Sequence, residues 1–360
     1  FPSTLLIQNF FCTEIETRSW IKSYSSGRTP RLRHRDAVSE RGYEQPTRRR
    51  SRHHNQSTHD KRPLELLPQR PSRVVDARDV LWILDTGRVL FKALLLEASP
   101  GGTKLISIDL ESGTITRTYL FPTTVAKPTS YFDDVRFDTE RGFAYITDTS
   151  YDALDNAIVV LDLNTGESWR RLKRDRSLLD PSGEAIGAGF VMTGVDGIAL
   201  SPDLTTLYYS VIAGRFLYSV STALLRDRNT SDSEIVSFVR NLGEKGISTG
   251  LVCDSNGIVY AGQAEQSGVS MYDPSTRMTM LFVRDKRIKW VDTFSVTEDF
   301  LYFTVNQLNS LPATYPGQEF FWVDRRQKPY VLFRAELYGN ATKEPGSKVT
   351  DLRVSFINCI

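Results

Sequence analysis

Aspartates recur at one position of a repeated pattern in this chain. When similar segments are superposed, Asp133, Asp196, Thr249 and Asp292 fall in one column, and a shift of one residue would replace Asp133 with Asp134. Carboxylates held close together raise one another's pKa, which would suit one of them to accept a proton, and they can also neutralise a cation. The alternative is that each aspartate caps a turn through backbone amides, as isolated aspartates in loops commonly do.

A second polar set follows an aromatic residue in several of the same segments: Asp85, Asp148, Gln263 and Asn306. If the two strands concerned form an antiparallel hairpin, the start of one meets the end of the other. Both sets would then lie at one end of the molecule. The predicted ligand-binding residues are Asp133, Asp134, Asp148, Asp196, Thr249, Gln263, Asp292, Phe303, Thr304 and Asn306.

The chemistry available to these residues is that of oxygen ligands and carboxylic acids. Asp196 and Asp292 are the candidate acid and base, and together with Asn306 they are the candidate ligands of a metal ion. Oxygen ligands without imidazole or thiolate favour Ca²⁺ or Mg²⁺ over Zn²⁺. All four histidines lie within residues 34–59. A Ser-His-Asp triad, a Cys-His pair or a histidine zinc site would therefore have to recruit that segment, which we do not expect.

The elements that must position these residues form a repeat. Five copies of a four-strand unit can be traced, marked by one aromatic residue each: Trp82, Tyr145, Tyr208, Tyr260 and Tyr302. Their successive spacings are 63, 63, 52 and 42 residues, and a period of this length with short strands is typical of propeller blades. The turns ESG, NTG, SNG and ERG supply the Gly or Asn that a hairpin needs. We predict an all-β, six-bladed β-propeller, and the alternative is a double β-sandwich.

Strands such as AIVVL are apolar on both faces, which is expected of sheets packed between two neighbours. The core should therefore lie between blades. Five blades are evident, and the sixth is either incomplete or formed by the chain termini, because ring closure usually joins terminal strands. The C-terminal VTDLRVSFINCI and the N-terminal LLIQNFF or RSWIKSY are the candidate strands.

Charge divides the chain into two parts. Residues 1–62 hold thirteen Lys/Arg and six Asp/Glu, whereas the remainder holds thirty-two and thirty-seven, so a formal net charge of +2 combines +7 with −5. The first part has few aliphatic residues and cannot offset its ordering entropy by burial. We therefore expect a disordered basic segment over residues 1–65 and a propeller domain over 66–360. Neither a nucleic-acid motif nor an apolar run long enough to span a membrane is present.

Two features of the sequence bear on whether the protein is secreted. Sequons for N-glycosylation occur at Asn55, Asn229 and Asn340, which is compatible with secretion. The three cysteines, Cys12, Cys253 and Cys359, form no CxxC motif and cannot all pair within the chain. The expectation is a secreted, extracellular glycoprotein.

Several motifs together resemble the yellow and major royal jelly protein family, including its microbial members related to dopachrome tautomerase. These motifs are LWILDTG, AYITDTS, GVDGIALSPD, LYYSVIAGRFLYSV and LYFTVNQL, in the family's order. The resemblance covers about residues 74–340. Residues 1–65, where the family has a further blade, do not match, and the family's cysteine pattern is not evident.

The resemblance implies a six-bladed propeller with a central cavity for small molecules, biogenic amines in some members and dopachrome-like indoles in others. An aromatic amine, catechol or indole compound is thus the expected ligand, with stacking from Tyr131, Phe132, Phe216 or Phe303, and dopachrome-type tautomerisation is the expected reaction. One alternative is a metal-dependent lactonase or esterase, because related gluconolactonase-like propellers place a divalent metal in the tunnel. Another is a scaffold or storage protein without catalysis. Membership of a family predicts the fold of a protein more directly than it predicts the reaction.

Overall fold

The structure, a computed structural model, places most of residues 67–337. It describes residues 67–68, 72–98 with gaps at 77, 92–93 and 97, 101–150, 155–179, 194–310 except 213, 325–327 and 331–337. The predicted disordered segment over residues 1–65 and the C-terminal strands proposed for a sixth blade lie outside the described residues. Among the described residues, no helix is both long enough and apolar enough to cross a bilayer.

Five antiparallel sheets follow one another along the chain as the blades of a β-propeller. Blade 1 contains β2 (Ser72–Val75), β3 (Val80–Asp85), β6 (Lys104–Asp109) and β7 (Ile115–Leu120). Blade 2 contains β8 (Phe132–Asp138), β9 (Phe143–Asp148), β10 (Ala157–Asp162) and β11 (Ser168–Arg171). Blade 3 contains β12 (Val195–Leu200), β13 (Thr206–Val211), β14 (Phe216–Ser221) and β15 (Arg240–Glu244).

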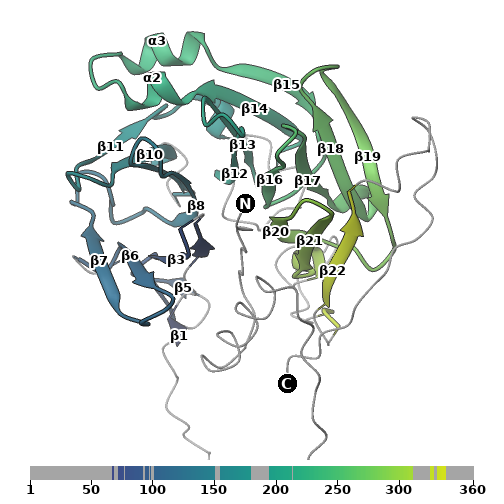
Figure 1. Cartoon of the computed structure of the whole chain (residues 1–360), viewed down its shortest axis with the longest axis horizontal. Helices are drawn as coiled ribbons and strands as arrows, with labels where there is room; N and C mark the ends of the chain where they lie inside the picture. Colours follow the sequence, from purple (N-terminus) through teal and green to yellow (C-terminus); the bar gives the residue numbers. More distant parts are fainter. Residues whose placement is uncertain are drawn as a thin grey trace, which may run out of the picture.

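Blade 4 contains β16 (Leu251–Cys253), β17 (Val259–Gln263), β18 (Gly268–Asp273) and β19 (Met278–Arg284). Blade 5 has three described strands, β20 (Val291–Val296), β21 (Phe300–Val305) and β22 (Val331–Glu336). Figure 1 shows the blades in an arc, with β8, β12, β16 and β20 toward the centre and β7, β11, β15 and β19 outside. The five repeats traced in the sequence are confirmed as sheets, and a sixth blade stays a prediction.

Some short elements were not anticipated. A small sheet joins β1 (Leu67–Pro68) to β4 (Val89–Phe91) and β5 (Leu94–Leu95), the last two being inserted between β3 and β6. Two short helices, α2 (Thr222–Arg226) and α3 (Asp232–Ser237), connect β14 to β15. Single 3₁₀ turns are η2 (Arg176–Leu178), η3 (Ala264–Gln266) and η4 (Leu308–Ser310).

The outer hairpins close through the turn chemistry that the sequence predicts. In the β6–β7 turn the Gly113 amide donates to the Asp109 carbonyl at 2.8 Å, and Gly113 has a φ of +67°. The Asp109 carboxylate also accepts from the Ser112 amide at 2.7 Å. Asp162 and Gly166 form the same turn between β10 and β11. A glycine is required at these sites because other residues adopt positive φ at a cost.

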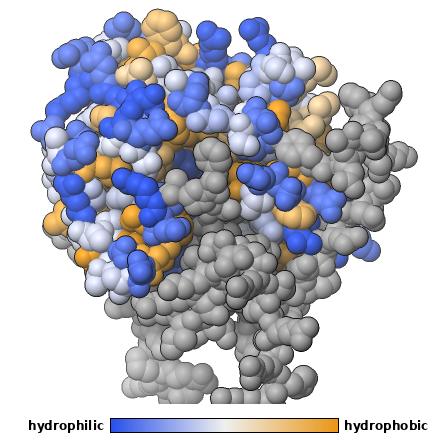
Figure 2. Space-filling view, in the orientation of Figure 1, coloured by the Kyte–Doolittle hydropathy of each residue, from blue (hydrophilic) through white to orange (hydrophobic). Residues whose placement is uncertain are grey.

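The hydrophobic core lies between adjacent blades, as predicted. Trp82 of β3 stacks on Phe137 of β8 with ring centroids 4.6 Å apart, which joins blade 1 to blade 2. Tyr145 of blade 2 and Tyr209 of blade 3 are fully buried in one cluster of apolar residues. The coloured surface in Figure 2 is mostly hydrophilic with scattered apolar residues, consistent with cores that are hidden between sheets.

Candidate functional site

Three aspartates stand at irregular positions in the innermost strands. The register of β8 against β9 shifts between Phe132 and Val135, and Asp133 lies within that shift. Equivalent shifts lie between Val195 and Ile198 in β12 and between Val291 and Thr293 in β20. Asp196 and Asp292 fall within them. A β-bulge redirects a side chain out of the regular alternation, and here the same device recurs in blades 2, 3 and 5.

These three residues, which we call the carboxylate cluster, interact electrostatically. Burial, followed by repulsion from Asp292 and Asp134, raises the pKa of Asp133 to about 7. Burial, and then repulsion from Asp133 and Asp292, raises the pKa of Asp196 well above its usual value. A side-chain hydrogen bond joins Asp133 and Asp196, and it lowers the pKa of Asp133 while raising that of Asp196. The two carboxyls therefore occupy one site and titrate together.

The cluster is neither sealed nor fully open. Asp196 is 6% exposed, whereas Asp133 and Asp292 are only partly buried. Solvent therefore reaches two of the three carboxylates.

Thr249 occupies the equivalent position in blade 4. Its hydroxyl lies 3.0 Å from the Asp292 carboxylate and 3.1 Å from the Val291 carbonyl, and it accepts from the Trp290 indole at 3.2 Å. A hydroxyl has one proton to give, so the two acceptors share it. Thr249 thus holds Asp292 in place beside blade 4.

Asp134 has a different environment from its neighbour Asp133. Its carboxylate accepts from Arg136 at 2.8 Å and from the Val135 amide at 3.0 Å. Arg136 in turn donates to the Leu251 carbonyl at 2.9 Å, in β16 of blade 4. Asp134 is therefore neutralised by an arginine that joins blades 2 and 4, and the ambiguity left by the sequence is resolved with Asp133 in the cluster.

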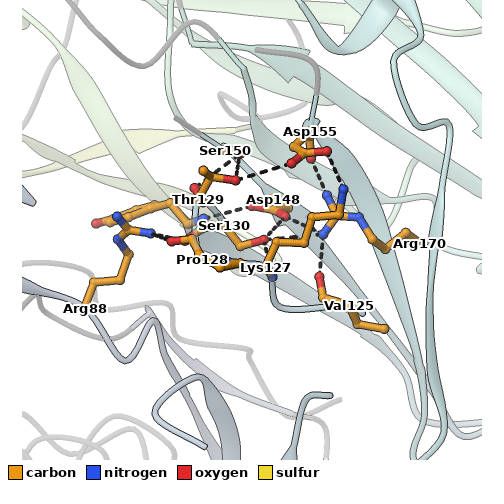
Figure 3. Close-up of polar contacts among 11 residues, drawn as sticks. Arg88, Val125, Lys127, Pro128, Thr129, Ser130, Asp148, Ser150, Asp155 and Arg170 are labelled. Carbon is orange, nitrogen blue, oxygen red and sulfur yellow. Dashed lines mark hydrogen bonds and ion pairs between the residues drawn. The ribbon is translucent and has the colours of Figure 1, made fainter. Parts of the chain in front are cut away.

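Asp148, a predicted ligand-binding residue, lies in a buried polar network (Figure 3). Its carboxylate accepts from the Ser130 hydroxyl at 2.6 Å, the Tyr131 amide at 2.8 Å and the Arg170 guanidinium at 2.6 Å. Burial raises the pKa of Asp148, but all three contacts are donors that favour the ionised form. Because both Asp148 and Arg170 are almost fully buried, the pair fastens blade 2 internally.

The second polar set of the sequence analysis lies at the same end of the blades as the column of aspartates, as the hairpin argument predicted. Asp148 pairs with Phe132 in the β8–β9 register, and Val305 pairs with Val291 in the β20–β21 register. Asp85 accepts from the Gly87 amide at 2.8 Å and pairs with Lys104 at 2.9 Å. Asn306 accepts from the Leu308 amide at 2.9 Å. The described contacts of Asp85 and Asn306 are thus those of turn-forming residues.

The expected aromatic partners are distributed differently from the prediction. Phe303 is buried in the core of blade 5, stacked on Phe333 at 5.4 Å, and Thr304 beside it is also buried. Phe132 packs edge-on against Phe121 at 5.0 Å, while Phe216 is 41% exposed on the surface. Of the four aromatics named from the sequence, Tyr131 alone is a half-buried residue close in sequence to the cluster.

The donor set does not fit a divalent metal ion. Asp196, Asp292 and Asn306 were the candidates, but the described part of the chain contains no group of three or more His, Cys, Asp or Glu side chains that could hold a metal.

Two side chains near the candidate site were not anticipated from the sequence. Arg136 contacts a carbonyl 115 residues away, and no local pattern announces such a contact. Lys245, just after β15, is 1% exposed. It lies near Asp196 and Gln263, because Asp196 acts on its pKa and the Gln263 amide donates to the Lys245 carbonyl at 3.4 Å. Its position four residues before Thr249 was the only available signal.

Comparison with known proteins gives the family. The family model for major royal jelly protein matches residues 72–317. Protein yellow of Drosophila erecta and of Drosophila melanogaster are each 27% identical over 217 residues, covering 56% of this chain and 39% of theirs. The chain therefore matches about two-fifths of the length of these curated relatives.

Solved propellers are more distant. A luciferin-regenerating enzyme aligns at 13% identity and a TM-score of 0.44, covering 75% of this chain and 92% of that one. A gluconolactonase from Xanthomonas campestris aligns at 14% identity and a TM-score of 0.40, covering 64% and 66%. The structure describes five blades, with acidic residues repeated at the inner strands. The family model matches most of this propeller. On that match, the chain belongs to the major royal jelly protein family.

Proposed function

We propose that the carboxylate cluster binds the ammonium group of a small aromatic amine of the catechol or indole class at the centre of the propeller. The observation that carries the proposal is the convergence of Asp133, Asp196 and Asp292 from the inner strands of three blades, where the charge of Asp292 acts on both other carboxyls. Carboxylates that repel one another gain from a cation placed among them. Family membership supports the fold that presents the site but leaves the ligand open.

Magnitudes favour the carboxylates over the aromatic residues as the main source of affinity. Opposite charges about 4 Å apart attract by about 4 kcal/mol at an effective dielectric constant of about 20, before desolvation is subtracted. A cation–π contact contributes about 0.5–2 kcal/mol. Because Phe132 and Phe303 are used in cores, Tyr131 is the aromatic residue left to contact a ligand ring. The ammonium group should therefore matter more than the ring.

The same residues could catalyse a dopachrome-type tautomerisation, which we propose as the reaction. Such a reaction removes a proton from carbon and returns one elsewhere. Asp133, with a pKa raised to about 7, is suited to accept the proton, and protonated Asp196 is suited to supply one. In this scheme neither residue needs an imidazole partner.

Isothermal titration calorimetry with dopamine and tryptamine tests the binding. We expect millimolar or tighter affinity for both, and at least about tenfold weaker binding of catechol and indole, which lack the ammonium group. Asp133→Asn should weaken amine binding by about tenfold or more, whereas the matched variant Asp85→Asn should not. Equal binding of charged and neutral compounds would rule out the proposal, and no binding at all would favour a scaffold or storage protein.

Dopachrome decay measured with and without the protein tests the reaction separately. Turnover above background that is lost in Asp133→Asn is the expected result. Amine binding without turnover would retain the binding function and reject the tautomerase.

We also propose that the protein is a secreted glycoprotein. Asn229, in the sequon Asn229-Thr230-Ser231, is exposed in the segment between α2 and α3. Expression through a eukaryotic secretory pathway should give a mass decrease on endoglycosidase treatment, which Asn229→Gln reduces. An unchanged mass would refute modification at this site.

A further inference from the structure

A cavity lies between blades 3 and 4, and none of the three residues of the carboxylate cluster lines it. It measures about 380 Å³, which is within the range of small-molecule sites. Lys245, Gln263 and Ser270 line it with polar groups. Met280 and Leu281 of β19, 44% and 43% exposed, add an apolar side, and the Arg215–Glu265 ion pair at 2.7 Å adds a charged one.

Lys245 is an unusual residue for such a position. It is 1% exposed, and its ammonium nitrogen donates to the Gly246 carbonyl at 2.7 Å. Within the described residues, no carboxylate lies at ion-pair distance from it. A buried ammonium has three protons to place, and leaving some unplaced is costly. The neutral amine, which is a nucleophile, is therefore favoured.

The electrostatic surroundings agree with this geometry. Burial lowers the pKa of Lys245 to about 7, opposed by the charges of Asp196 on β12 and Glu265 on η3. Glu244 and Arg215 also line the cavity. At pH 7 about half of the Lys245 side chains would be neutral, against roughly one in 2,500 for a lysine with an ordinary pKa of about 10.4.

Gln263 provides a second, independent observation. It is 9% exposed, and its buried side-chain oxygen has no hydrogen-bond partner among the described residues. The amide is fixed by close packing, because a Cβ on Gly246 would overlap it. A buried acceptor without a donor is costly. A hydroxyl on a ligand in the cavity would relieve that cost.

We propose that this cavity is a second small-molecule site, which takes small aldehydes or ketones and joins them to Lys245 as a Schiff base. The Lys245 nitrogen attacks the carbonyl carbon, and a proton moves from nitrogen to the carbonyl oxygen to give a carbinolamine. Its hydroxyl donates to the Gln263 oxygen; when the C=N bond forms, the C–O bond breaks and the hydroxyl leaves as water with the remaining proton of the nitrogen. The alkyl portion lies against Met280 and Leu281. No oxidant or reductant is consumed.

Reductive trapping of the full chain tests the proposal. Butanal and sodium cyanoborohydride at pH 7 convert a Schiff base into a stable butyl-lysine, which peptide mass spectrometry locates. Lys173, whose side chain is 55% exposed, is the internal comparison. We expect Lys245 to be alkylated at least about tenfold faster than Lys173. Equal or slower labelling of Lys245 would overturn the proposal.

A pair of variants on β19 tests whether the aldehyde reaches Lys245 through this cavity. Met280→Trp fills the cavity, whereas Met278→Trp changes a residue on the same strand, 56% exposed, that does not line it. We expect Met280→Trp to slow labelling of Lys245 by about fivefold or more and Met278→Trp to leave it unchanged, with labelling of Lys173 the same in both. Labelling unaffected by Met280→Trp would show that the aldehyde reaches Lys245 from elsewhere and would reject this cavity as the site.

Discussion

The side chains of Asp196 and Asp133 are hydrogen-bonded across the boundary between blades 3 and 2. The two carboxyls therefore titrate as a pair, and the chemistry of either depends on the proton held by the other. Asp292, from blade 5, adds repulsion to both. Three blades thus contribute to one acid–base unit.

The role of the Asp196 proton can be separated from that of its charge. Asp196→Asn keeps a donor to Asp133, so we expect amine affinity at pH 7 to stay within about threefold of wild type. Asp196→Val removes the donor, which should raise the pKa of Asp133 further and weaken binding at pH 7, with recovery at pH 8. Calorimetry with dopamine at both pH values distinguishes the two variants. Equal losses in both would mean that Asp196 acts by its negative charge.

Stability should fall as pH rises through the titration of Asp133. Its folded-state pKa, about 7, is higher than the ordinary aspartate value of 3.8, so the folded state binds more protons than the unfolded state between these values. The stabilising contribution is fully present below about pH 4 and is lost as pH rises to about 7. Asp133→Asn should therefore raise the melting temperature by at least about 2 °C at pH 8 and have little effect at pH 4.

Thermal melts of wild type and Asp133→Asn across pH 4–8 give this result as a difference, in which the titration of other groups largely cancels. A melting-temperature difference that is constant with pH would contradict the raised pKa.

The buried pair of Asp148 and Arg170 should be a large source of stability in blade 2. Asp148→Asn leaves the Arg170 charge without its partner at a site where both side chains are at most 5% exposed. We expect a loss of about 3–5 kcal/mol in the free energy of unfolding. Urea denaturation measures it. The matched control is Lys104→Met, which breaks the more exposed Lys104–Asp85 pair and should cost about 1 kcal/mol or less.

Gly250 should tolerate no side chain, for reasons of space. A Cβ at this position would overlap the Asp292 carbonyl oxygen of the next inner strand. Gly250→Ala should cost about 2–4 kcal/mol, since backbone rather than a side chain must move. Gly257→Ala is the comparison: nothing lies within 4 Å of its Cβ, and only its φ of +86° resists substitution, at about 1 kcal/mol. Denaturant unfolding that ranks the two variants in the reverse order would contradict the close inter-blade contact.

The repeat made the blades predictable. Trp82, Tyr145, Tyr208, Tyr260 and Tyr302 lie in the second strands of successive sheets, as their spacing indicated. The column of Asp133, Asp196 and Asp292 was also visible, because equivalent strands carry it at equivalent places. Superposition of the repeats could not predict the direction in which each side chain points, because the strands are buried on both faces. Phe303 was therefore expected at the site although it packs on Phe333.

Contacts between distant segments were also beyond the sequence. Lys245 reads as an ordinary charged loop residue, and only the fold reveals that it is buried beside Gln263. Short helices such as α2 and α3 were missed because five or six residues give too little periodicity to be recognised.

The contact made by Arg136 changes how the propeller is expected to respond when one blade unfolds. In a repeat architecture where each unit contacts only its neighbours, stability is a sum of local terms and one unit can unravel while distant ones persist. The Arg136 bond from blade 2 to the Leu251 carbonyl of blade 4 bypasses blade 3. Unfolding of blade 4 would remove the acceptor of the charged Arg136 donor in blade 2. We therefore expect blades 2 and 4 to unfold together. The propeller should then unfold with greater cooperativity than a row of blades held by nearest neighbours alone.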